Sequence, residues 1–331
     1  MIISRAPVRF SLGGGGTDIP AYCDQFGGYL VAGAVDKYVY VSANKRFYDD
    51  IRLSYSKTEI VAEVDMIEHR IFREALRMTG VTRGIELTSV ADVPANCGLG
   101  SSSAFTVALL NALHAYRRDF CSSRSLAEEA CKLEIERLGE PIGKQDQYIS
   151  AFGGVTAFTF ERDGSVNVEP VPASNETLDD LQNNLCIIYS GVERAASTVL
   201  SEQVQRIKQL DGATIERMDE IKALGHDAYR LLVSGDIDSY GELLHEHWTA
   251  KRKLASKMTD PDIDEHYEAA RKAGAIGGKL MGAGGGGFFM FYVRPADKRR
   301  VIEAMVARGL RQLRFRFDMD GARIIANLQR S

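Results

Sequence analysis

Hydrophobic and polar residues follow two different periods along this chain, which predict strands and helices mixed throughout its length. Strand-like runs of β-branched and aromatic residues are expected at Ile2–Leu12, Tyr29–Lys45, Gly84–Val90, Val155–Phe160 and Leu185–Tyr189. Helical spacing of apolar residues is expected over Val64–Met78, Ala104–Leu113, Leu126–Leu138 and Lys144–Phe152. Polar helices follow between about residues 195 and 273, and strands flank a helix from Ile276 to Asn327. The pattern indicates an α+β fold in both halves.

The length of the chain predicts two domains, because 331 residues suffice for two hydrophobic cores. The stretch Pro170–Asp180 combines prolines with small polar residues, which is typical of a linker. We therefore expect an N-terminal domain at residues 1–172 and a C-terminal domain at residues 173–331.

Composition and charge argue against several classes of protein. The net charge of −4 disfavours general electrostatic binding to nucleic acid or to an anionic membrane. No apolar run approaches the ~20 residues of a membrane span, and the N-terminus lacks the apolar core of a signal peptide. The five scattered cysteines contain no Cys-x-x-Cys pair, which fits reduced thiols better than disulfides or a zinc site. We expect a cytoplasmic protein. The sequence does not distinguish a monomer from a homodimer.

The most informative segment runs from Pro94 to Ala104 and has the sequence Pro-Ala-Asn-Cys-Gly-Leu-Gly-Ser-Ser-Ser-Ala. It predicts a strand, a glycine turn and then a helix that begins at three consecutive serines. Gly98 and Gly100 permit a ligand to approach the backbone closely, because glycine has no Cβ. Unpaired N–H groups and the dipole at the helix start favour an anion. We interpret the segment as a phosphate site; an ordinary serine-capped helix is the alternative.

A second glycine cluster, from Gly282 to Gly287, formally matches the Gly-x-Gly-x-x-Gly pattern of dinucleotide sites. Those sites need a helix after the glycines, whereas an apolar aromatic run of strand character, Phe288–Val293, follows here. A dinucleotide site is therefore disfavoured. The alternatives are a flexible hairpin or a loop that closely approaches a ligand or another segment of backbone.

A third glycine cluster follows the first predicted strand, in the sequence Arg5-Ala-Pro-Val-Arg9-Phe-Ser-Leu-Gly-Gly-Gly-Gly-Thr17-Asp18. Arg9 is suited to neutralise a phosphoryl group, and Asp18 is suited to accept hydrogen bonds from hydroxyl groups. Taken singly, each has a plain alternative, a surface arginine and an aspartate that caps a turn.

Together the three segments resemble the GHMP kinase superfamily of small-molecule kinases, because all three motifs occur in the family's order. The resemblance covers nearly the whole chain, and its third motif is Lys279-Leu-Met-Gly-Ala-Gly-Gly-Gly-Gly. It implies an N-terminal domain with a left-handed βαβ unit and a ferredoxin-like C-terminal domain. It also implies ATP as co-substrate, Mg²⁺ as cofactor and an alcohol group as phosphoryl acceptor.

The sequences Glu134-Ile-Glu136-Arg and Gly143-Lys-Gln-Asp146-Gln-Tyr narrow the resemblance further. With the first motif they are similar to bacterial D-glycero-D-manno-heptose 7-phosphate kinases, which phosphorylate the anomeric C1 hydroxyl of a sugar phosphate. That activity gives the 1,7-bisphosphate on the route to nucleotide-activated heptose. The alternatives are a kinase of another sugar, such as fucose or galactose, and a non-catalytic sugar sensor on the same fold.

The resemblance assigns roles to individual residues. Asp146 matches the catalytic aspartate, which either takes the proton of the sugar hydroxyl or only orients that hydroxyl. Arg9 matches a basic residue that stabilises the transferring phosphoryl group. Ser102 and Glu136 match the metal ligands, with Glu134 as a possible substitute because the alignment contains a one-residue gap. The residues expected to bind ATP are Pro94, Gly98, Leu99, Gly100, Ser101, Ser102 and Ser103.

The acceptor side of the site is also implied by the resemblance. The residues expected to bind substrate are Thr17, Asp18, Asp146, Gly284 and Gly285, together with Arg194. The phosphate that the substrate already carries requires Arg, Lys or backbone amides. Arg194 and the basic stretch Lys251-Arg252-Lys253 are both candidates for that role, and a solvated basic surface is the alternative for each.

Overall fold

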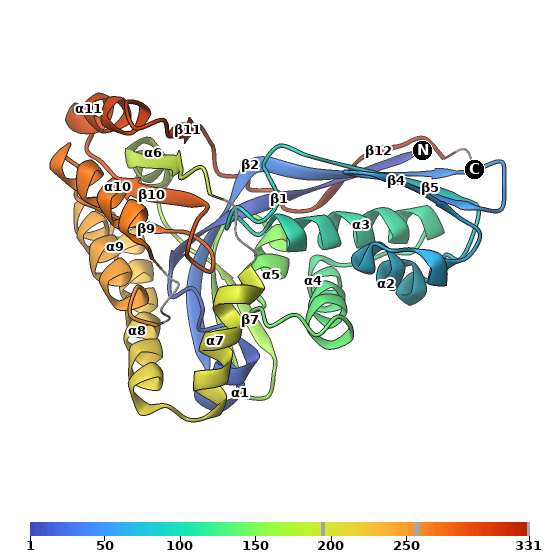
Figure 1. Ribbon diagram of the computed structural model, residues 1–331, viewed down its shortest axis with the longest axis horizontal. Coiled ribbons are helices and arrows are strands. Elements are labelled where there is room, and N and C mark those ends of the chain that lie inside the picture. Colours follow the sequence, from blue (N-terminus) through green and yellow to red (C-terminus); the bar gives the residue numbers. More distant parts are fainter. Residues whose placement is uncertain (193–195, 255–258, 330–331) are drawn as a thin grey trace.

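The computed structural model describes residues 1–192, 196–254 and 259–329, which form two β-sheets with helices packed against them (Figure 1). The larger sheet has eight strands in the order β12-β1-β2-β5-β3-β4, with β6 joined to β2 and β7 joined to β6. Its strands are β1 (Ile2–Gly13), β2 (Gly28–Lys45), β3 (Ile51–Ser54), β4 (Thr58–Val61), β5 (Ile85–Ala91), β6 (Val155–Phe160), β7 (Val166–Pro170) and β12 (Arg323–Asn327).

Helices from distant parts of the chain pack on this sheet or on one another. They include α1 (Pro20–Phe26), α2 (Arg70–Thr79), α3 (Ser101–Arg117), α4 (Ser123–Cys131), α5 (Gln145–Phe152), α7 (Ala196–Lys208) and α8 (Gly212–Ser234). The first four residues of β1 alternate between buried and half-buried. From Ala6 to its end the strand is buried throughout. Continuous burial follows because α3, α5 and α8 all contact β1. The polar side chain of Arg9 is thereby carried into the interior.

The smaller sheet lies in the other half of the molecule, on the left of Figure 1. All its neighbouring strands are antiparallel, in the order β11 (Arg311–Leu313), β8 (Leu185–Tyr189), β10 (Phe288–Tyr292) and β9 (Gly277–Leu280). The helices of this half include α6 (Asn175–Asn184), α9 (Ile237–Lys251), α10 (Pro261–Lys272) and α11 (Pro295–Val306). Helices and strands interleave in both halves, which confirms the α+β prediction.

Two expectations about elements need correction. The expected helix over Val64–Met78 is a short 3₁₀ turn (Val64–Met66) followed by α2. The expected linker over Pro170–Asp180 contains the start of α6, because the Ser174 hydroxyl accepts a hydrogen bond from the Thr177 amide at 3.0 Å and caps that helix. The domain boundary between residues 172 and 173 stays a prediction; the last strand, β12, pairs with β1 in the larger sheet.

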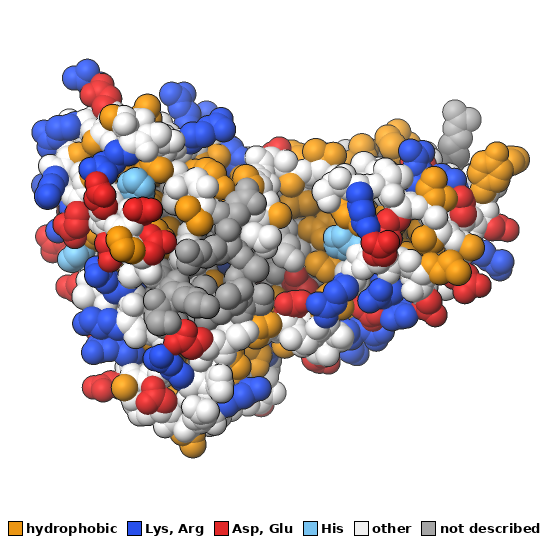
Figure 2. All heavy atoms as spheres, viewed as in Figure 1, with side chains coloured by type: hydrophobic (Ala, Val, Ile, Leu, Met, Phe, Trp, Pro, Cys, Tyr) orange, Lys and Arg blue, Asp and Glu red, His pale blue; other side chains and the backbone are white. Residues whose placement is uncertain are grey.

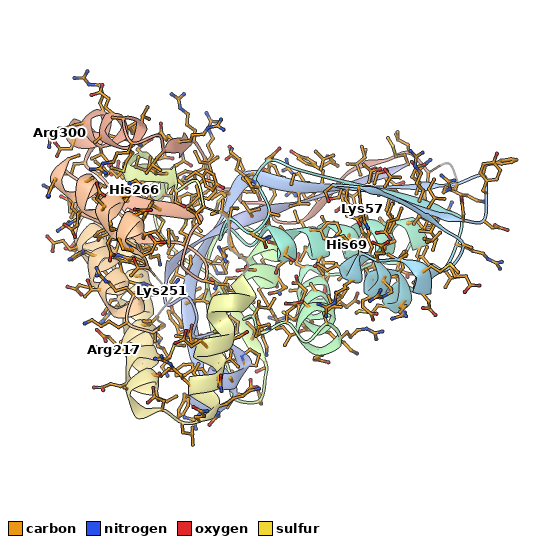
Figure 3. All side chains as sticks on the ribbon, viewed as in Figure 1. Lys57, His69, Arg217, Lys251, His266 and Arg300 are labelled. Carbon is orange, nitrogen blue, oxygen red and sulfur yellow. The ribbon has the colours of Figure 1, made fainter. Side chains whose placement is uncertain are left out.

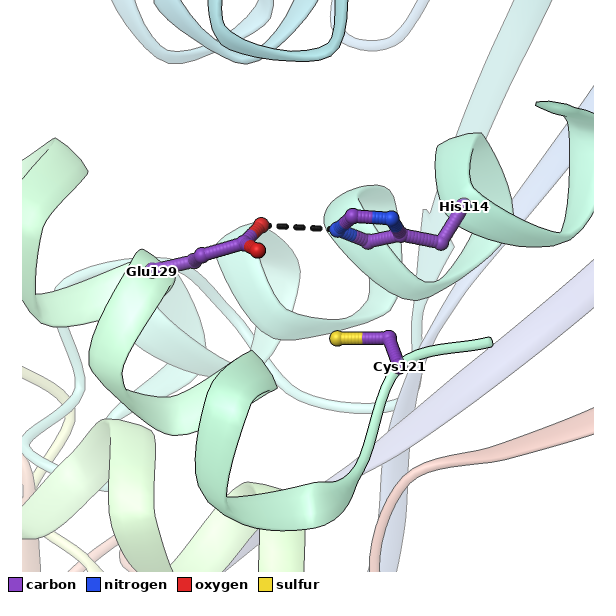
Figure 4. Close-up of side chains that lie close together, drawn as sticks. All are labelled: His114, Cys121 and Glu129. Atoms are coloured by element: carbon purple, nitrogen blue, oxygen red, sulfur yellow. Dashed lines mark hydrogen bonds and ion pairs between the residues drawn. The ribbon is translucent and has the colours of Figure 1, made fainter. Parts of the chain in front are cut away.

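The helix expected over Leu126–Leu138 is α4 continued by a π-helical segment, Lys132–Arg137. The last turn of α4 is joined to the last turn of α3 by a hydrogen bond of 2.7 Å between His114 Nε2 and Glu129 Oε2, and Cys121 lies beside the pair (Figure 4). π-Helical turns often occur at functional sites. This one presents Glu134 to the interior, as described below.

The surface agrees with the charge balance of the sequence. On the face drawn in Figure 2, basic and acidic side chains are interspersed over both halves, so the described residues on this face form no continuous basic band. Among the helices of the described ranges, none is both long enough and apolar enough to cross a membrane.

Candidate active site

A cavity of about 440 Å³ lies where the three glycine segments of the chain meet. The end of β1, the start of α3, the start of α5 and the loop after β9 all contribute to its wall. The predicted site residues that line it are Arg9, Asp18, Gly98, Gly100, Ser101, Ser102, Ser103, Asp146 and Gly284. The fold thus brings together residues that are up to 275 positions apart in the sequence, namely Arg9 and Gly284.

Arg9 and Asp146 form a bidentate ion pair at the centre of this wall. Arg9 Nε donates to Asp146 Oδ1 at 2.6 Å, and Arg9 Nη2 donates to Asp146 Oδ2 at 2.9 Å. The third guanidinium nitrogen, Nη1, donates to the carbonyl oxygen of Gly98 at 2.5 Å. Because Arg9 is only 4% exposed, its rotamer is fixed, and it holds the carboxylate against the glycine loop.

The glycine loop is shaped to let that carboxylate approach. Gly100 precedes α3 with a φ of 74°, in the left-handed region that favours glycine. A Cβ atom on Gly100 would lie 2.8 Å from Asp146 Oδ2, closer than real Cβ contacts. Gly100 is therefore required both for the turn and for the position of Asp146.

The start of α3 provides the expected anion-binding geometry. Its N-cap is Gly100, so no side chain caps the first amides of a helix that is 17 residues long. Free N–H groups at this position and the helix dipole favour phosphate oxygens. Two residues predicted to bind ATP do not line the cavity: Pro94 is exposed and Leu99 is buried. The Leu99 carbonyl instead accepts a hydrogen bond from the Arg9 amide at 3.0 Å, which joins the loop to β1.

The acidic residue beside the serines is Glu134, not Glu136. Glu136 is exposed and does not line the cavity, so the structure does not bring this predicted metal ligand to the site. Glu134 lines the cavity; its Oε1 accepts from Ser102 Oγ at 3.2 Å and its Oε2 from Gln147 Nε2 at 2.6 Å. Burial raises the pKa of Glu134 to about 7, although hydrogen bonds from Ser103, Gln147 and Ser102 oppose the shift.

Ser102 and Glu134 fit a hard cation. Both offer oxygen ligands at the cavity wall, next to the uncapped start of α3. The raised pKa of Glu134 is what a buried carboxylate without a neighbouring positive charge should show. A divalent cation would supply that charge, so the donor set and its electrostatics suit Mg²⁺.

Asp18 lines the cavity and also organises its floor. Its carboxylate accepts hydrogen bonds from the amides of Gly16 at 3.0 Å and Gln145 at 2.9 Å, so it holds the start of α5 where Asp146 lies. Burial raises its pKa, with backbone hydrogen bonds acting in the opposite direction and Asp146 adding to the increase. Thr17 does not line the cavity; its hydroxyl is buried and bonds to the carbonyls of Gly14 and Tyr29 at 2.9 Å each.

The C-terminal glycine loop closes the cavity from the other half of the molecule. Gly284 lines it, whereas its neighbour Gly285 is buried and does not. The loop connects β9 and β10, which are antiparallel neighbours, so it lacks the strand–helix arrangement of a dinucleotide site. A Cβ on Gly282 would meet the Cα of Gly98 at 2.5 Å, so two of the glycine segments are in backbone contact. Arg194 lies outside the described residues.

Two lysines line the cavity, of which Lys251 was among the sequence candidates for the substrate's phosphate and Lys279 was not. Lys251, at the end of α9, was one of three residues in a basic stretch, and its neighbours Arg252 and Lys253 are exposed. Its position seven residues after Leu244, which is buried, places it on the apolar face of α9 and was a usable signal. Lys279 occupies a fully buried strand, where a lysine is rare.

Apolar side chains also line the cavity. They include Ile71 of α2 and two residues between the π-helical segment and α5, Leu138 and Ile142, and a hydrogen bond of 2.6 Å from Arg70 to the Leu138 carbonyl joins these two segments. Leu138 and Ile142 are called the apolar end below. An apolar slot next to an anion site can accept a flat ring that is attached to a phosphate.

Comparison with known proteins agrees with this site. Residues 53–154 match the family model for the GHMP kinases N terminal domain, and residues 228–311 match the model for GHMP kinases C terminal. The chain therefore belongs to the GHMP kinase family. It is an ATP-dependent phosphotransferase with an alcohol group as acceptor, and its two-domain fold is the family's, as the motifs predicted.

Individual relatives place it among the sugar kinases of the family. The chain is 28% identical over 316 residues to D-glycero-alpha-D-manno-heptose 7-phosphate kinase of Campylobacter jejuni, which covers 92% of this chain and 93% of that protein. It is 26% identical to the L-fucokinase/L-fucose-1-P guanylyltransferase of Bacteroides fragilis, covering 96% of this chain but 37% of that protein. The crystal structure of a D-glycero-D-manno-heptose 1-phosphate kinase from Bacteroides thetaiotaomicron has a TM-score of 0.83 and 25% identity, over 99% of this chain and 100% of that one.

Proposed function

We propose that this protein transfers the γ-phosphoryl group of ATP to the anomeric C1 hydroxyl of D-glycero-D-manno-heptose 7-phosphate, giving the 1,7-bisphosphate and ADP. The observation that carries the proposal is the Arg9–Asp146 pair, fixed between the phosphate loop and Asp18 in one cavity. The similarity to heptose kinases over nearly the full length of both chains supports this sugar.

The nucleotide is proposed to bind at the start of α3. The free amides of Ser101, Ser102 and Ser103 face its β- and γ-phosphates, and the apolar end formed by Leu138 and Ile142 receives its base. Ser102 and Glu134 would hold Mg²⁺, which when bound neutralises charge on the phosphate oxygens. Glu134 takes the role that was expected for Glu136, because only Glu134 lines the cavity.

The acceptor is proposed to lie between Asp18 and Asp146. Its C1 hydroxyl oxygen attacks the γ-phosphorus, the bond from that phosphorus to the β–γ bridging oxygen breaks, and ADP leaves with the electron pair. Asp146 accepts the hydroxyl proton, which is more acidic at an anomeric carbon than in an ordinary alcohol. The Arg9 guanidinium lies beside Asp146 and faces the charge on the transferred group.

The activity is tested by ADP release with Mg²⁺ and ATP against a panel of sugars: heptose 7-phosphate, free heptose, fucose and galactose. We expect the largest kcat/KM for heptose 7-phosphate. Preference for an unphosphorylated sugar would keep the proposed chemistry and reject the proposed substrate. Absence of sugar-dependent ADP release with the whole panel would reject a sugar kinase and favour a sensor.

A further inference from the structure

The two buried lysines of the cavity form no ion pair within the described ranges. Lys251 is 9% exposed and Lys279 is 1% exposed, yet both line the cavity. Lys251 Nζ donates to the carbonyl oxygen of Gly282, and within the described ranges neither ammonium group has a carboxylate at ion-pair distance. Arg9, the third cation of this wall, differs because Asp146 balances its charge.

Burial of ammonium groups without an ion-pair partner is unfavourable. Burial lowers the pKa of Lys251 to about 8 and the charge of Arg9 lowers it further, while Asp18 and Asp146 act in the opposite direction. Burial also lowers the pKa of Lys279 well below its usual value, and Lys251 lowers it further. His247, buried behind them, has no hydrogen-bond partner on either ring nitrogen within the described structure and supplies no negative charge. An anionic ligand in the cavity would give these two ammonium groups the direct partner that they lack.

The position of the lysines separates them from the expected nucleotide phosphates. The uncapped amides of α3, with Ser102 and Glu134, belong to the N-terminal half of the chain. Lys251 comes from the end of α9 in the other half of the molecule (Figure 3), where it bonds to the C-terminal glycine loop. Its charge is felt by Asp18 and Asp146 on the acceptor side.

Lys279 comes from β9, the strand that leads into the same glycine loop, and α9 packs against β9. Both lysines therefore belong to the part of the cavity wall that the C-terminal half of the chain contributes. Asp146 and the start of α3 belong to the part that the N-terminal half contributes. A sugar with its reacting hydroxyl at Asp146 can direct its other end toward the two lysines.

We propose that Lys251 and Lys279 together bind the phosphate group that the acceptor already carries, and so select a phosphorylated sugar over a free one. This inference rests on the proposed function. It favours Lys251, from the basic stretch, over Arg194 for that role and adds Lys279, because two buried ammonium groups without an ion-pair partner in the described ranges form a site for a dianion.

The test uses the variants Lys251→Met and Lys279→Met, which remove the charge and keep most of the side-chain volume. Lys253→Met is the matched control, because Lys253 follows Lys251 by two residues and is exposed. With saturating ATP, kcat/KM is measured for heptose 7-phosphate and for free heptose. We expect each lysine variant to lose roughly 100-fold with the phosphorylated sugar, mainly through KM. Free heptose should be used within threefold of wild type.

Equal losses on both sugars would overturn the inference, because they would mean that the lysines act on the transferred phosphoryl group or on folding. Unchanged values on both sugars would overturn it as well. Thermal unfolding provides an independent check on folding. Lys279→Met should be at least as stable as wild type, because an apolar isostere replaces an unbalanced buried charge, whereas a purely structural lysine would give a less stable variant.

A binding measurement separates this inference from the proposed function. Inorganic phosphate is titrated calorimetrically into enzyme whose nucleotide site is filled with ADP. Wild type and Lys253→Met should bind phosphate, and the two cavity variants should bind at least tenfold more weakly. If the kinase assay rejected heptose 7-phosphate, loss of phosphate binding in the variants would still support the lysine site. Equal binding by all four proteins would overturn it.

Discussion

Replacement of Asp146 by Asn tests the arrangement on which the proposed chemistry depends. The substitution keeps the size of the side chain and removes the charge that faces Arg9. In the native pair two donors of Arg9 meet two carboxylate oxygens, at 2.6 and 2.9 Å. An amide offers only one acceptor oxygen, so one N–H of Arg9 would face an NH₂ group.

The magnitude follows from the burial of the two partners. Removing one member of a buried ion pair costs about 3–5 kcal/mol, because the other charge stays buried without compensation. Arg9 is buried, but the Asp146 side chain is 21% exposed, so water screens part of the interaction. We therefore expect Asp146→Asn to lower the free energy of unfolding by about 2 kcal/mol, below the fully buried range.

The effect on the rate should be larger than the effect on stability. Loss of a group that accepts the hydroxyl proton should lower kcat by about 10²- to 10⁴-fold. The KM for ATP should change little, because the amides at the start of α3 are untouched. Steady-state ADP release gives the kinetic constants, and urea denaturation gives the free energy of unfolding.

The control is Asp262→Asn, which changes an exposed aspartate in the first turn of α10 and so removes a comparable charge from a helix start. It should leave kcat unchanged. An Asp146→Asn enzyme with kcat within threefold of wild type would refute the assignment of Asp146 as the catalytic residue. If Asp146→Asn lowered the stability but not the rate, the Arg9–Asp146 ion pair would have a structural role only.

Three further predictions follow from other contacts in the cavity. Gly100→Ala should lower the free energy of unfolding by about 1–2 kcal/mol, because alanine is strained in the left-handed backbone conformation of this residue. It should also lower kcat roughly 100-fold, because the new Cβ would displace Asp146; full activity in the ADP assay would contradict this. Glu134→Gln should raise the Mg²⁺ concentration for half-maximal rate at least roughly tenfold, while Glu136→Gln should not; equal Mg²⁺ titrations would count against the assignment. The pKa of Lys251 is about 8, so this lysine loses its positive charge between pH 7 and pH 9. KM for the phosphorylated sugar should therefore rise over that range; a KM that does not change with pH would argue against a role for the charge of Lys251.

The order of the elements and the three motifs were accessible from the sequence, because they depend on local patterns. Alternating and helical periods located β1, α3 and α5, and the glycines beside Ser101–Ser103 indicated an anion site before any contact was known. The Arg9–Asp146 pair followed only from family resemblance, since no local pattern relates residues 137 positions apart.

The choice between Glu134 and Glu136 was decided by which face of one helix is buried. Ala127 and Glu134 are seven residues apart and both buried, which is the spacing of one helix face. Glu136 lies off that face and is exposed. Helical spacing therefore contained the answer, although the π-helical segment through both residues could not be predicted.

Lys279 was harder to assign, because a lysine in a glycine-rich motif gives no indication of its own burial. Its position depends on the pairing of β9 with β10 and on the approach of the Gly282 loop to the Gly98 loop. Those are contacts between segments far apart in the chain. Long-range packing of this kind leaves no periodic signal in a single sequence.

The central claim is that the phosphoryl group of ATP is transferred to the anomeric hydroxyl of heptose 7-phosphate in this cavity. Phosphorus NMR of the reaction with ATP and Mg²⁺ tests it most directly. The account predicts a second sugar phosphorus signal coupled to the anomeric proton, beside the unchanged 7-phosphate and in step with ADP formation. A new phosphate coupled to any other sugar proton, or ADP formed without a new sugar phosphate, would contradict it.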